Sequence, residues 1–170
     1  MAETQGMKEQ LDKLAAELGR RLLEREIMLA TAESCTGGWI AQVITGAPGS
    51  SAWFDRGFVT YSNLAKQEML GVSDTSLETQ GAVSAQVVAE MLAGALQFSQ
   101  AQATIAVSGI AGPGGGTEDK PVGTVFLGWA LAGREPLVRR FQFAGDREEV
   151  RRQTVRLALE RFIELFDEDG

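Results

Sequence analysis

The sequence contains no histidine, and its only cysteine is Cys35. Without an imidazole the chain cannot build a Ser-His-Asp triad, so any nucleophile here needs a lysine or a carboxylate as its base. One cysteine cannot form an internal disulfide, and the lack of histidine also argues against a zinc site. We therefore expect no metal and no cofactor.

Positive charge and long apolar runs are also scarce. Sixteen basic residues stand against 23 acidic ones, a net charge of −7 that opposes attraction to DNA or RNA backbones. No apolar run approaches the roughly 20 residues that span a bilayer, and the first ten residues contain no signal-peptide core. We expect a cytoplasmic protein with no nucleic-acid or membrane partner.

The composition and the pattern of apolar residues indicate one globular domain over residues 1–170. Hydrophobic residues make up 44% of the chain, which is enough for a packed core. Apolar and turn-forming residues predict helices over residues 7–25, 37–44, 63–70 (capped by Asn63), 84–99 and 146–168, and strands over 27–32, 53–62 (with a possible bulge around Gly57), 103–107, 122–132 and 136–143. This order predicts an α/β fold, a three-layer α/β/α sandwich on a mixed, mostly parallel sheet.

The segment between the first strand and the second helix carries two candidate nucleophiles, Ser34 and Cys35. They precede Gly37 and Gly38 at a point where free backbone N–H groups converge, a geometry that suits an oxyanion or a phosphate. A simpler interpretation is that Ser34 or Thr36 caps the helix. Cys35 is the weaker nucleophile candidate, because no histidine is present to pair with it and free cysteine is commonly a small buried residue.

A lysine base for Ser34 is available in Lys66, which follows the second predicted strand together with Tyr61 and Ser62. A solvated lysine is a free amine in only roughly one molecule in 2,500 at pH 7, so catalysis requires a lowered pKa. Tyr61 would relay or orient the proton. The alternative is that Lys66 is an ordinary surface lysine, in which case Tyr61 or Glu33 is the next candidate for the base.

Two further features suit a small anionic ligand. Residues 108–117 form a glycine-rich loop that matches neither a complete dinucleotide fingerprint nor the Gly-Lys-Ser/Thr phosphate motif. Basic residues gather at Arg139–Arg140 and at Arg147, Arg151 and Arg152. They would form a positive pocket for a compact metabolite, or else they are solvated ends of strands and helices.

Six ordered segments resemble the C-terminal domain of the competence/damage-inducible CinA proteins, and the resemblance extends from about Leu11 to Phe166. They are residues 32–38, 49–54, 57–63, 81–84, 108–113 and 120–125. The resemblance is strongest to the family's stand-alone bacterial form. Because the N-terminal molybdopterin-binding-like domain of the longer members has no counterpart here, activities of that domain are not expected.

The resemblance implies a nicotinamide-nucleotide amidohydrolase that converts nicotinamide mononucleotide to nicotinate mononucleotide and ammonia. Within it, Ser34 matches the nucleophile and Lys66 the base, with Tyr61 close to them. Ser51, Ser108 and Arg147 fall in other family motifs and are expected to contact substrate, as are Thr36, Gly37, Gly38 and Gly109. The partner is then a small-molecule nucleotide, and a homodimer is expected. The alternatives are a non-catalytic nucleotide-binding module and an interaction role in competence or DNA damage.

Overall fold

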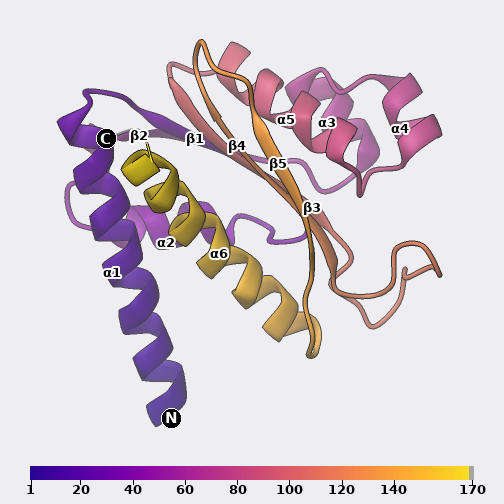
Figure 1. Cartoon of the computed structure of the whole chain (residues 1–170), viewed down its shortest axis with the longest axis horizontal. Helices are drawn as coiled ribbons and strands as arrows, with labels where there is room; N and C mark the ends of the chain where they lie inside the picture. The colour runs from indigo at the N-terminus through magenta and orange to yellow at the C-terminus, as the bar shows by residue number, and fades with distance from the viewer. Residues whose placement is uncertain (169–170) are drawn as a thin grey trace.

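A five-stranded sheet runs through the computed structural model, which describes residues 1–168, so the last two residues of the expected domain lie outside the described residues (Figure 1). The strand order is β2-β1-β3-β4-β5, with β1 (Leu29–Glu33), β2 (Phe54–Val59), β3 (Ala103–Gly109), β4 (Thr124–Leu131) and β5 (Leu137–Gln142). β1 pairs in parallel with β2 and β3, whereas β4 is antiparallel to β3 and β5. Only β4 opposes the other strands, and the predicted mixed, mostly parallel sheet is confirmed.

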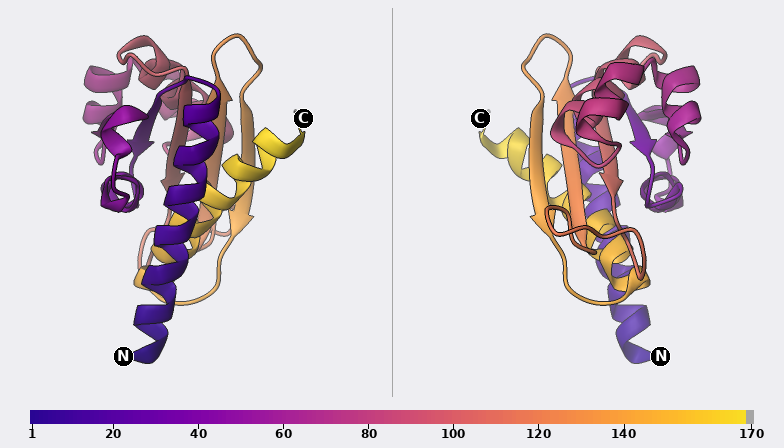
Figure 2. Two further views of the ribbon diagram at one scale, coloured as in Figure 1. Left: turned by 90° about the vertical axis from the view of Figure 1, so that its left-hand side faces the viewer. Right: turned by 90° about the vertical axis from the view of Figure 1, so that its right-hand side faces the viewer.

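One face of the sheet is covered by α1 (Ala2–Glu24), α2 (Trp39–Gly46) and α6 (Arg147–Glu168) (Figure 2). The apolar stripe that predicted the first helix is buried here and packs against side chains from α2, α6 and the sheet. The fully buried residues of this shared core include Leu18, Leu22, Ile40, Ile44, Leu159 and Phe162. Burial of this stripe supplies most of the free energy that holds the helices on the sheet.

The opposite face carries α3 (Asn63–Leu70), α4 (Asp74–Gln80) and α5 (Ala85–Gln97), which gives the predicted three layers (Figure 2). α5 packs on β3 and β4 through Val87, Val88, Met91 and Leu92. Its Gly94 lies against α3, where an added Cβ would sit 2.0 Å from the carbonyl oxygen of Leu70. Only glycine permits this approach, which fixes α3, and with it Lys66, relative to the sheet.

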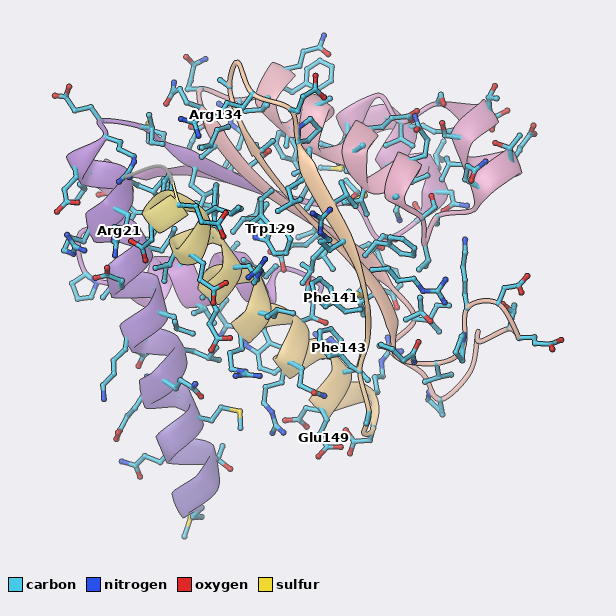
Figure 3. All side chains as sticks on the ribbon, viewed as in Figure 1. Arg21, Trp129, Arg134, Phe141, Phe143 and Glu149 are labelled. Atoms are coloured by element: carbon cyan, nitrogen blue, oxygen red, sulfur yellow. The ribbon has the colours of Figure 1, made fainter. Side chains whose placement is uncertain are left out.

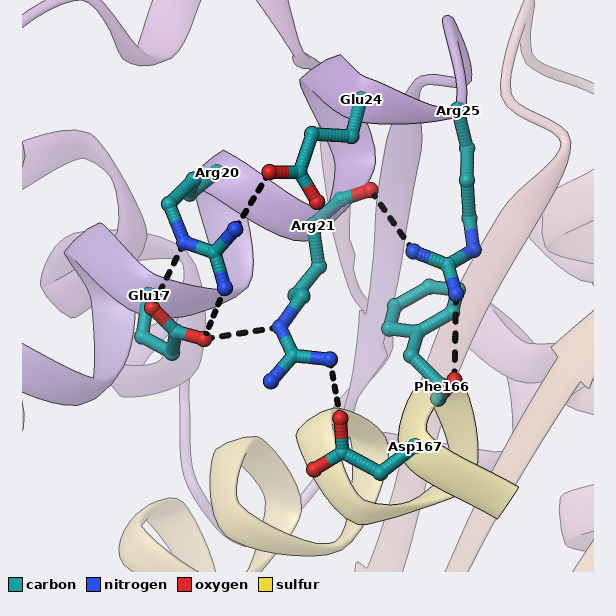
Figure 4. Close-up of polar contacts among 7 residues, drawn as sticks. All are labelled: Glu17, Arg20, Arg21, Glu24, Arg25, Phe166 and Asp167. Carbon is teal, nitrogen blue, oxygen red and sulfur yellow. Dashed lines mark hydrogen bonds and ion pairs between the residues drawn. The ribbon is translucent and has the colours of Figure 1, made fainter. Parts of the chain in front are cut away.

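The C-terminal ends of α1 and α6 are joined by polar contacts (Figure 4). Arg21 donates a hydrogen bond to Asp167, while Arg25 donates one of 3.0 Å to the Phe166 carbonyl and lies 4.5 Å over the Phe166 ring. Arg20 and Arg21 both donate to Glu17 and lower its pKa to about 2. Because these groups are partly or fully exposed to solvent, their ion pairs contribute little to the stability of the fold.

Trp129 of β4 anchors α6 to the sheet (Figure 3). Its indole is buried between the two elements, and its Nε1–H donates a hydrogen bond of 2.8 Å to the carbonyl oxygen of Ala158. The ring therefore contributes apolar area while its one polar group is satisfied.

The predicted elements occur in the predicted order, although α1 begins at Ala2 rather than residue 7 and β2 ends at Val59 rather than residue 62. Three further features differ. α4 was missed because Ser76 and Leu77 are its only buried residues, so the segment has no apolar periodicity. The bulge in β2 falls at Asp55 rather than around Gly57, and the unpaired Asp55 turns its carboxylate to the amide of Gln100, from which it accepts a hydrogen bond. Residues 50–52, for which no helix or strand was predicted, form the 3-10 turn η1 (Ser50–Ala52). Over the described residues, no helix combines the length and the apolar character needed to cross a membrane.

Candidate active site

The carboxyl ends of the parallel strands bring the predicted site residues to one edge of the sheet. Ser34 follows β1, Tyr61 follows β2, and Ser108 and Gly109 end β3. The glycine-rich loop after β3 projects from the same edge (Figure 1). In open α/β sheets this edge is where ligands bind, so the topology alone concentrates the candidates.

The turn between β1 and α2 presents Ser34 on the face of the sheet that carries α3. Side chains alternate along a strand, so Glu33 points to the α2 face and Ser34 to the other. The Ser34 carbonyl accepts a hydrogen bond of 3.0 Å from the amide of Gly37, which closes the turn. Gly37 and Gly38 have φ values of +59° and +97°, a left-handed conformation that glycine adopts without strain.

Glu33 holds the start of α2, a role that the sequence analysis did not assign to it. The carboxylate is 1% exposed and accepts hydrogen bonds from the amides of Ile40 and Ala41 and from the hydroxyl of Thr36, at 2.9, 3.0 and 2.6 Å. The suggestion that Ser34 or Thr36 caps the helix is wrong, since the N-cap residue is Gly38 and no side chain at that position bonds the helix. Ser34 is thereby left free for chemistry.

We expect Glu33→Ala to lower the free energy of unfolding by about 3 to 5 kcal/mol. The substitution leaves three buried donors without an acceptor, and an unsatisfied buried donor costs about 1–3 kcal/mol. Glu33→Gln keeps the size and one acceptor oxygen, so its loss should be smaller. Urea denaturation measures both, with Glu68→Ala on the exposed surface of α3 as the control, which should change stability by less than about 0.5 kcal/mol. A Glu33→Ala protein as stable as this control would contradict the assignment.

Lys66 is buried beside Ser34 and is not the surface lysine that was the alternative. Its side chain is 1% exposed, and burial lowers its pKa from the usual value. α3 positions it: the Ser62 hydroxyl accepts a hydrogen bond from the amide of Ala65 and caps the helix, so the cap is Ser62 and not the predicted Asn63.

The Lys66 amine has three oxygen neighbours within hydrogen-bond distance. Nζ lies 3.0 Å from Ser34 Oγ, 2.9 Å from the Thr60 carbonyl oxygen and 3.2 Å from the Tyr61 carbonyl oxygen. Carbonyl oxygens only accept, so a neutral amine donates its two N–H groups to them and directs its lone pair at the Ser34 hydroxyl. This arrangement suits proton transfer between Ser34 and Lys66.

Cys35 has the environment of an inert thiol. Burial raises its pKa to about 12, and the nearby Glu33 carboxylate acts in the same direction. At neutral pH the thiol is protonated, whereas a nucleophilic cysteine needs thiolate character. Between the two candidate nucleophiles, the structure favours Ser34.

A cavity of about 270 Å³ opens over Ser34 and Lys66. Its lining comes from the Ser34 turn, the start of α3, the segment before α5, the glycine-rich loop and the start of α6; it comprises Ser34, Cys35, Tyr61, Asn63, Lys66, Ala82, Val83, residues 108–112, Gly114, Gly115 and Arg147. A larger cavity of about 450 Å³ lies between α1 and α6, but it contains no comparable pair of nucleophile and base.

The charge of this cavity differs from that of the whole chain. Its basic lining residues are Lys66 and Arg147, with no carboxylate among them, although the net charge of the protein is −7. The first residues of α3 and α6 also line it, and helix N-termini attract anions through their free N–H groups. The cavity therefore favours an anionic ligand.

Arg147 and Tyr61 meet at the cavity. Arg147 Nη2 donates a hydrogen bond of 3.1 Å to the Tyr61 hydroxyl, and Nη1 donates one of 2.7 Å to the carbonyl of Gly112 in the glycine-rich loop. The Tyr61 side chain is 63% exposed, and it is the Tyr61 backbone carbonyl that contacts Lys66. This geometry places the Tyr61 hydroxyl at the cavity rim beside Arg147.

The other predicted substrate contacts divide into two groups. Ser108 and Gly109 line the cavity with Ser34. Thr36, Gly37 and Gly38 form the turn beneath Ser34 and do not line it, and the Thr36 hydroxyl is engaged with Glu33. Ser51 lies in η1 before the amino end of β2, at the opposite edge of the sheet, so the fold does not bring it to Ser34.

Four lining or supporting residues were not foreseen in these roles: Asn63, Ala82 and Val83 line the cavity, and Arg151 supports the turn. The signals in the sequence were that Asn63, Ala82 and Val83 fall in two of the six ordered segments, residues 57–63 and 81–84, and that Arg151 belongs to a basic cluster with Arg147 and Arg152. Within residues 1–168, no group of three or more His, Cys, Asp or Glu side chains is placed to hold a metal ion.

Fold and site together define an α/β protein with a buried Ser–Lys pair under an anion-attracting cavity. The CinA C-terminal domain family matches residues 11–166, and the chain belongs to this family. It is 52% identical over 157 residues to the nicotinamide-nucleotide amidohydrolase PncC of Escherichia coli K12, covering 92% of this chain and 95% of that one. PncC of Pseudomonas putida is 53% identical over 152 residues, which cover 89% and 94% of the two chains.

A solved structure confirms the fold. The competence/damage inducible protein CihA from Agrobacterium tumefaciens superposes with a TM-score of 0.89 at 46% identity, covering 92% of this chain and 95% of that one. The family that the six segments predicted is therefore the one to which the chain belongs.

Proposed function

We propose that this protein hydrolyses the carboxamide of nicotinamide mononucleotide to give nicotinate mononucleotide and ammonia. The observation that carries the proposal is the contact of 3.0 Å between Lys66 Nζ and Ser34 Oγ at the floor of a cavity without carboxylates. The activity named for its relatives at about half identity gives the same substrate.

In the first half of the proposed reaction, Ser34 attacks the carboxamide carbon while its proton passes to Lys66. The tetrahedral intermediate collapses when Lys66 returns this proton to the departing nitrogen, which leaves as ammonia and gives a Ser34 ester. In the second half, water attacks the ester and gives a proton to Lys66, which then protonates Ser34 as nicotinate forms. Each proton taken by Lys66 is returned, so no external acid or base is consumed.

The phosphate of the substrate accounts for the charge of the cavity. Arg147 supplies a planar guanidinium that suits phosphate oxygens, and it lines the same cavity as the glycine-rich loop, whose Gly112, Gly114 and Gly115 present no side chain there. This pairing supports a nucleotide over free nicotinamide as substrate.

An ammonia-coupled assay across nicotinamide mononucleotide, free nicotinamide and the dinucleotide tests the proposal. We expect the mononucleotide to be the preferred substrate, because the other two lack a terminal phosphate monoester. Binding of the mononucleotide without ammonia release would favour the non-catalytic nucleotide-binding alternative. Neither binding nor release would favour the interaction role.

Metal independence is part of the proposal. Because a Ser–Lys mechanism assigns nucleophile, acid and base to side chains, exhaustive treatment with a chelator should leave the rate of ammonia release within experimental error of the untreated rate. The control adds the chelator already saturated with calcium. A loss of activity that one specific cation restores would contradict this prediction.

The proposal places the enzyme in the cytoplasm, because a charged nucleotide does not cross a membrane unaided. The expected homodimer stays a prediction, and light scattering of the purified protein measures it.

A further inference from the structure

The glycine-rich loop between β3 and β4 runs out from the sheet along one limb and returns along another. The amide of Gly123 donates a hydrogen bond of 2.7 Å to the carbonyl of Ile110, and a Cβ added at Gly116 would sit 2.7 Å from the backbone nitrogen of Val122. The two limbs are in close contact, so a group that holds the returning limb also holds the outgoing one. The outgoing limb lines the cavity over Ser34.

A second wall of this cavity is the short segment between α4 and α5, where Ala82 and Val83 line it. α4 ends at Gln80, and the next residue, Gly81, has a φ of +76°. The chain therefore turns from the helix directly into the wall. The position of the wall thus depends on how the end of α4 is held.

Lys120, on the returning limb, links the loop to this second wall. Its Nζ donates a hydrogen bond of 2.7 Å to the carbonyl of Gln80, and a Cβ added at Gly81 would sit 3.6 Å from the same Nζ. Residues 113–119 of the loop are exposed, whereas Lys120 is only partly exposed. An ammonium suits this place, because the last carbonyls of a helix have no partner within it and carry the negative end of its dipole.

Two arginines attach the loop to other elements. Arg147 of α6 donates a hydrogen bond of 2.7 Å to the carbonyl of Gly112, and Arg140 of β5 donates one of 2.6 Å to the carbonyl of Asp119. Both bonds come from α6 and β5, and neither reaches α4 or the segment after it. The hydrogen bond of Lys120 therefore sets the spacing between the loop and the second wall.

We propose that Lys120 is a positioning residue that fixes the width of the cavity and so restricts the substrate to a mononucleotide. The cavity volume of about 270 Å³ is just below the roughly 300–1,000 Å³ of typical small-ligand pockets. A dinucleotide carries a second nucleotide unit, which the space between the linked walls does not hold. The inference rests on the proposed amide hydrolysis, and it gives Lys120 no contact with the reacting atoms at Ser34.

The experiment compares Lys120→Met and Lys120→Arg with Lys13→Met, a matched control at an exposed lysine of α1. Methionine removes the donor, so we expect the KM for nicotinamide mononucleotide to rise about tenfold, an effect typical of losing one hydrogen bond from a charged group. kcat should stay within about threefold of wild type, because Ser34 and Lys66 are unchanged. Lys120→Arg keeps a donor and should recover most of the KM, and Lys13→Met should behave as the wild type.

The same variants are compared on the dinucleotide. The preference for the mononucleotide, measured as the ratio of the two kcat/KM values, should fall about tenfold in Lys120→Met, because the walls are no longer linked. A residue that only stabilised the fold would leave this ratio unchanged.

A second measurement needs no nucleotide. Hydrogen–deuterium exchange, followed by mass spectrometry, should be faster in Lys120→Met at residues 110–123 and 81–84 and unchanged in β1 and α3. A wild type that binds the mononucleotide without releasing ammonia would defeat the proposed function alone, and dissociation constants from calorimetry would then decide on Lys120 in place of KM. A wild type that neither binds nor hydrolyses the mononucleotide would defeat both proposals.

Four other results would overturn the inference. They are a KM of Lys120→Met within about threefold of wild type, a lowered kcat with KM unchanged, an unchanged preference for the mononucleotide, and faster exchange spread over the whole chain, which would mean that Lys120 only stabilises the fold. Circular dichroism checks folding. If Lys120→Met does not fold, Lys120→Gln, whose shorter side chain does not reach the Gln80 carbonyl, decides on the same criteria.

Discussion

Replacing Ser34 with alanine is expected to abolish ammonia release from nicotinamide mononucleotide, with a loss of at least about 10⁴-fold in kcat. Only the attacking oxygen is removed, and its one side-chain hydrogen-bond partner among the described residues is Lys66, so the fold should persist. Binding of the nucleotide should stay within a few-fold of wild type, because the cavity and Arg147 are unchanged. Rapid-quench or coupled assays measure the rate, and calorimetry measures binding.

Cys35→Ala is the matched control for the adjacent residue. The Cys35 thiol has a pKa of about 12 and stays protonated, so its removal should cost little activity beyond a modest packing loss. An active Ser34→Ala protein would overturn the assignment of the nucleophile. So would an inactive Cys35→Ala protein of normal stability.

Lys66→Arg is expected to lower kcat by about 100-fold or more, because arginine keeps the charge but does not deprotonate in proteins. Lys66→Ala should be similarly impaired. In the wild type, activity should rise with pH through the lowered pKa of Lys66, since only the neutral amine accepts the Ser34 proton. Near-normal turnover in Lys66→Arg would mean that Lys66 acts by charge or structure. The Tyr61 hydroxyl at the cavity rim would then be the next candidate for the base, because Glu33 lies on the opposite face of the sheet and is bonded to α2.

The same pKa makes stability depend on pH. Burial lowers the pKa of Lys66 in the folded state below the value of 10.5 for an exposed lysine, so the unfolded chain binds more protons between these two values. The free energy of unfolding should therefore rise with pH across that window. Lys66→Met removes this contribution, so the wild type should gain stability relative to Lys66→Met as pH increases, which urea titrations at several pH values measure.

Much of the fold follows from local patterns in the sequence. The amphipathic spacing of Leu11, Leu18 and Leu22 predicts α1, and the buried run at Leu29 and Ala30 predicts β1. α4 has no such pattern, since its position depends on the Ser73 cap and on contacts of Ser73 and Ser76 with Glu90 of α5. Hydrogen bonds between residues far apart in the chain leave no periodic signal.

The candidate site also has a part that local sequence predicted and a part that only the fold shows. Ser34, Cys35 and the two glycines lie next to one another in the sequence, so a strand-turn-helix pattern was enough to single them out. The choice between Ser34 and Cys35 depended on burial, because a thiol surrounded by apolar groups keeps its proton. The role of Glu33 was invisible for a similar reason, since a glutamate at the end of a strand gives no sign of which helix amides it will reach.

The sequence by itself determined what this protein cannot use, namely an imidazole or a pair of cysteines, and it determined the family through six ordered segments. Only the tertiary structure decided that Lys66 is buried against Ser34, that Arg151 approaches the turn from α6, and that Ser51 lies at the far edge of the sheet. The physical reason is that composition and local periodicity belong to single segments of the chain. The contact of Lys66 with Ser34 and the hydrogen bond from Arg151 to the Cys35 carbonyl join segments that lie 32 and 116 residues apart in the chain. Such contacts exist only in the folded structure.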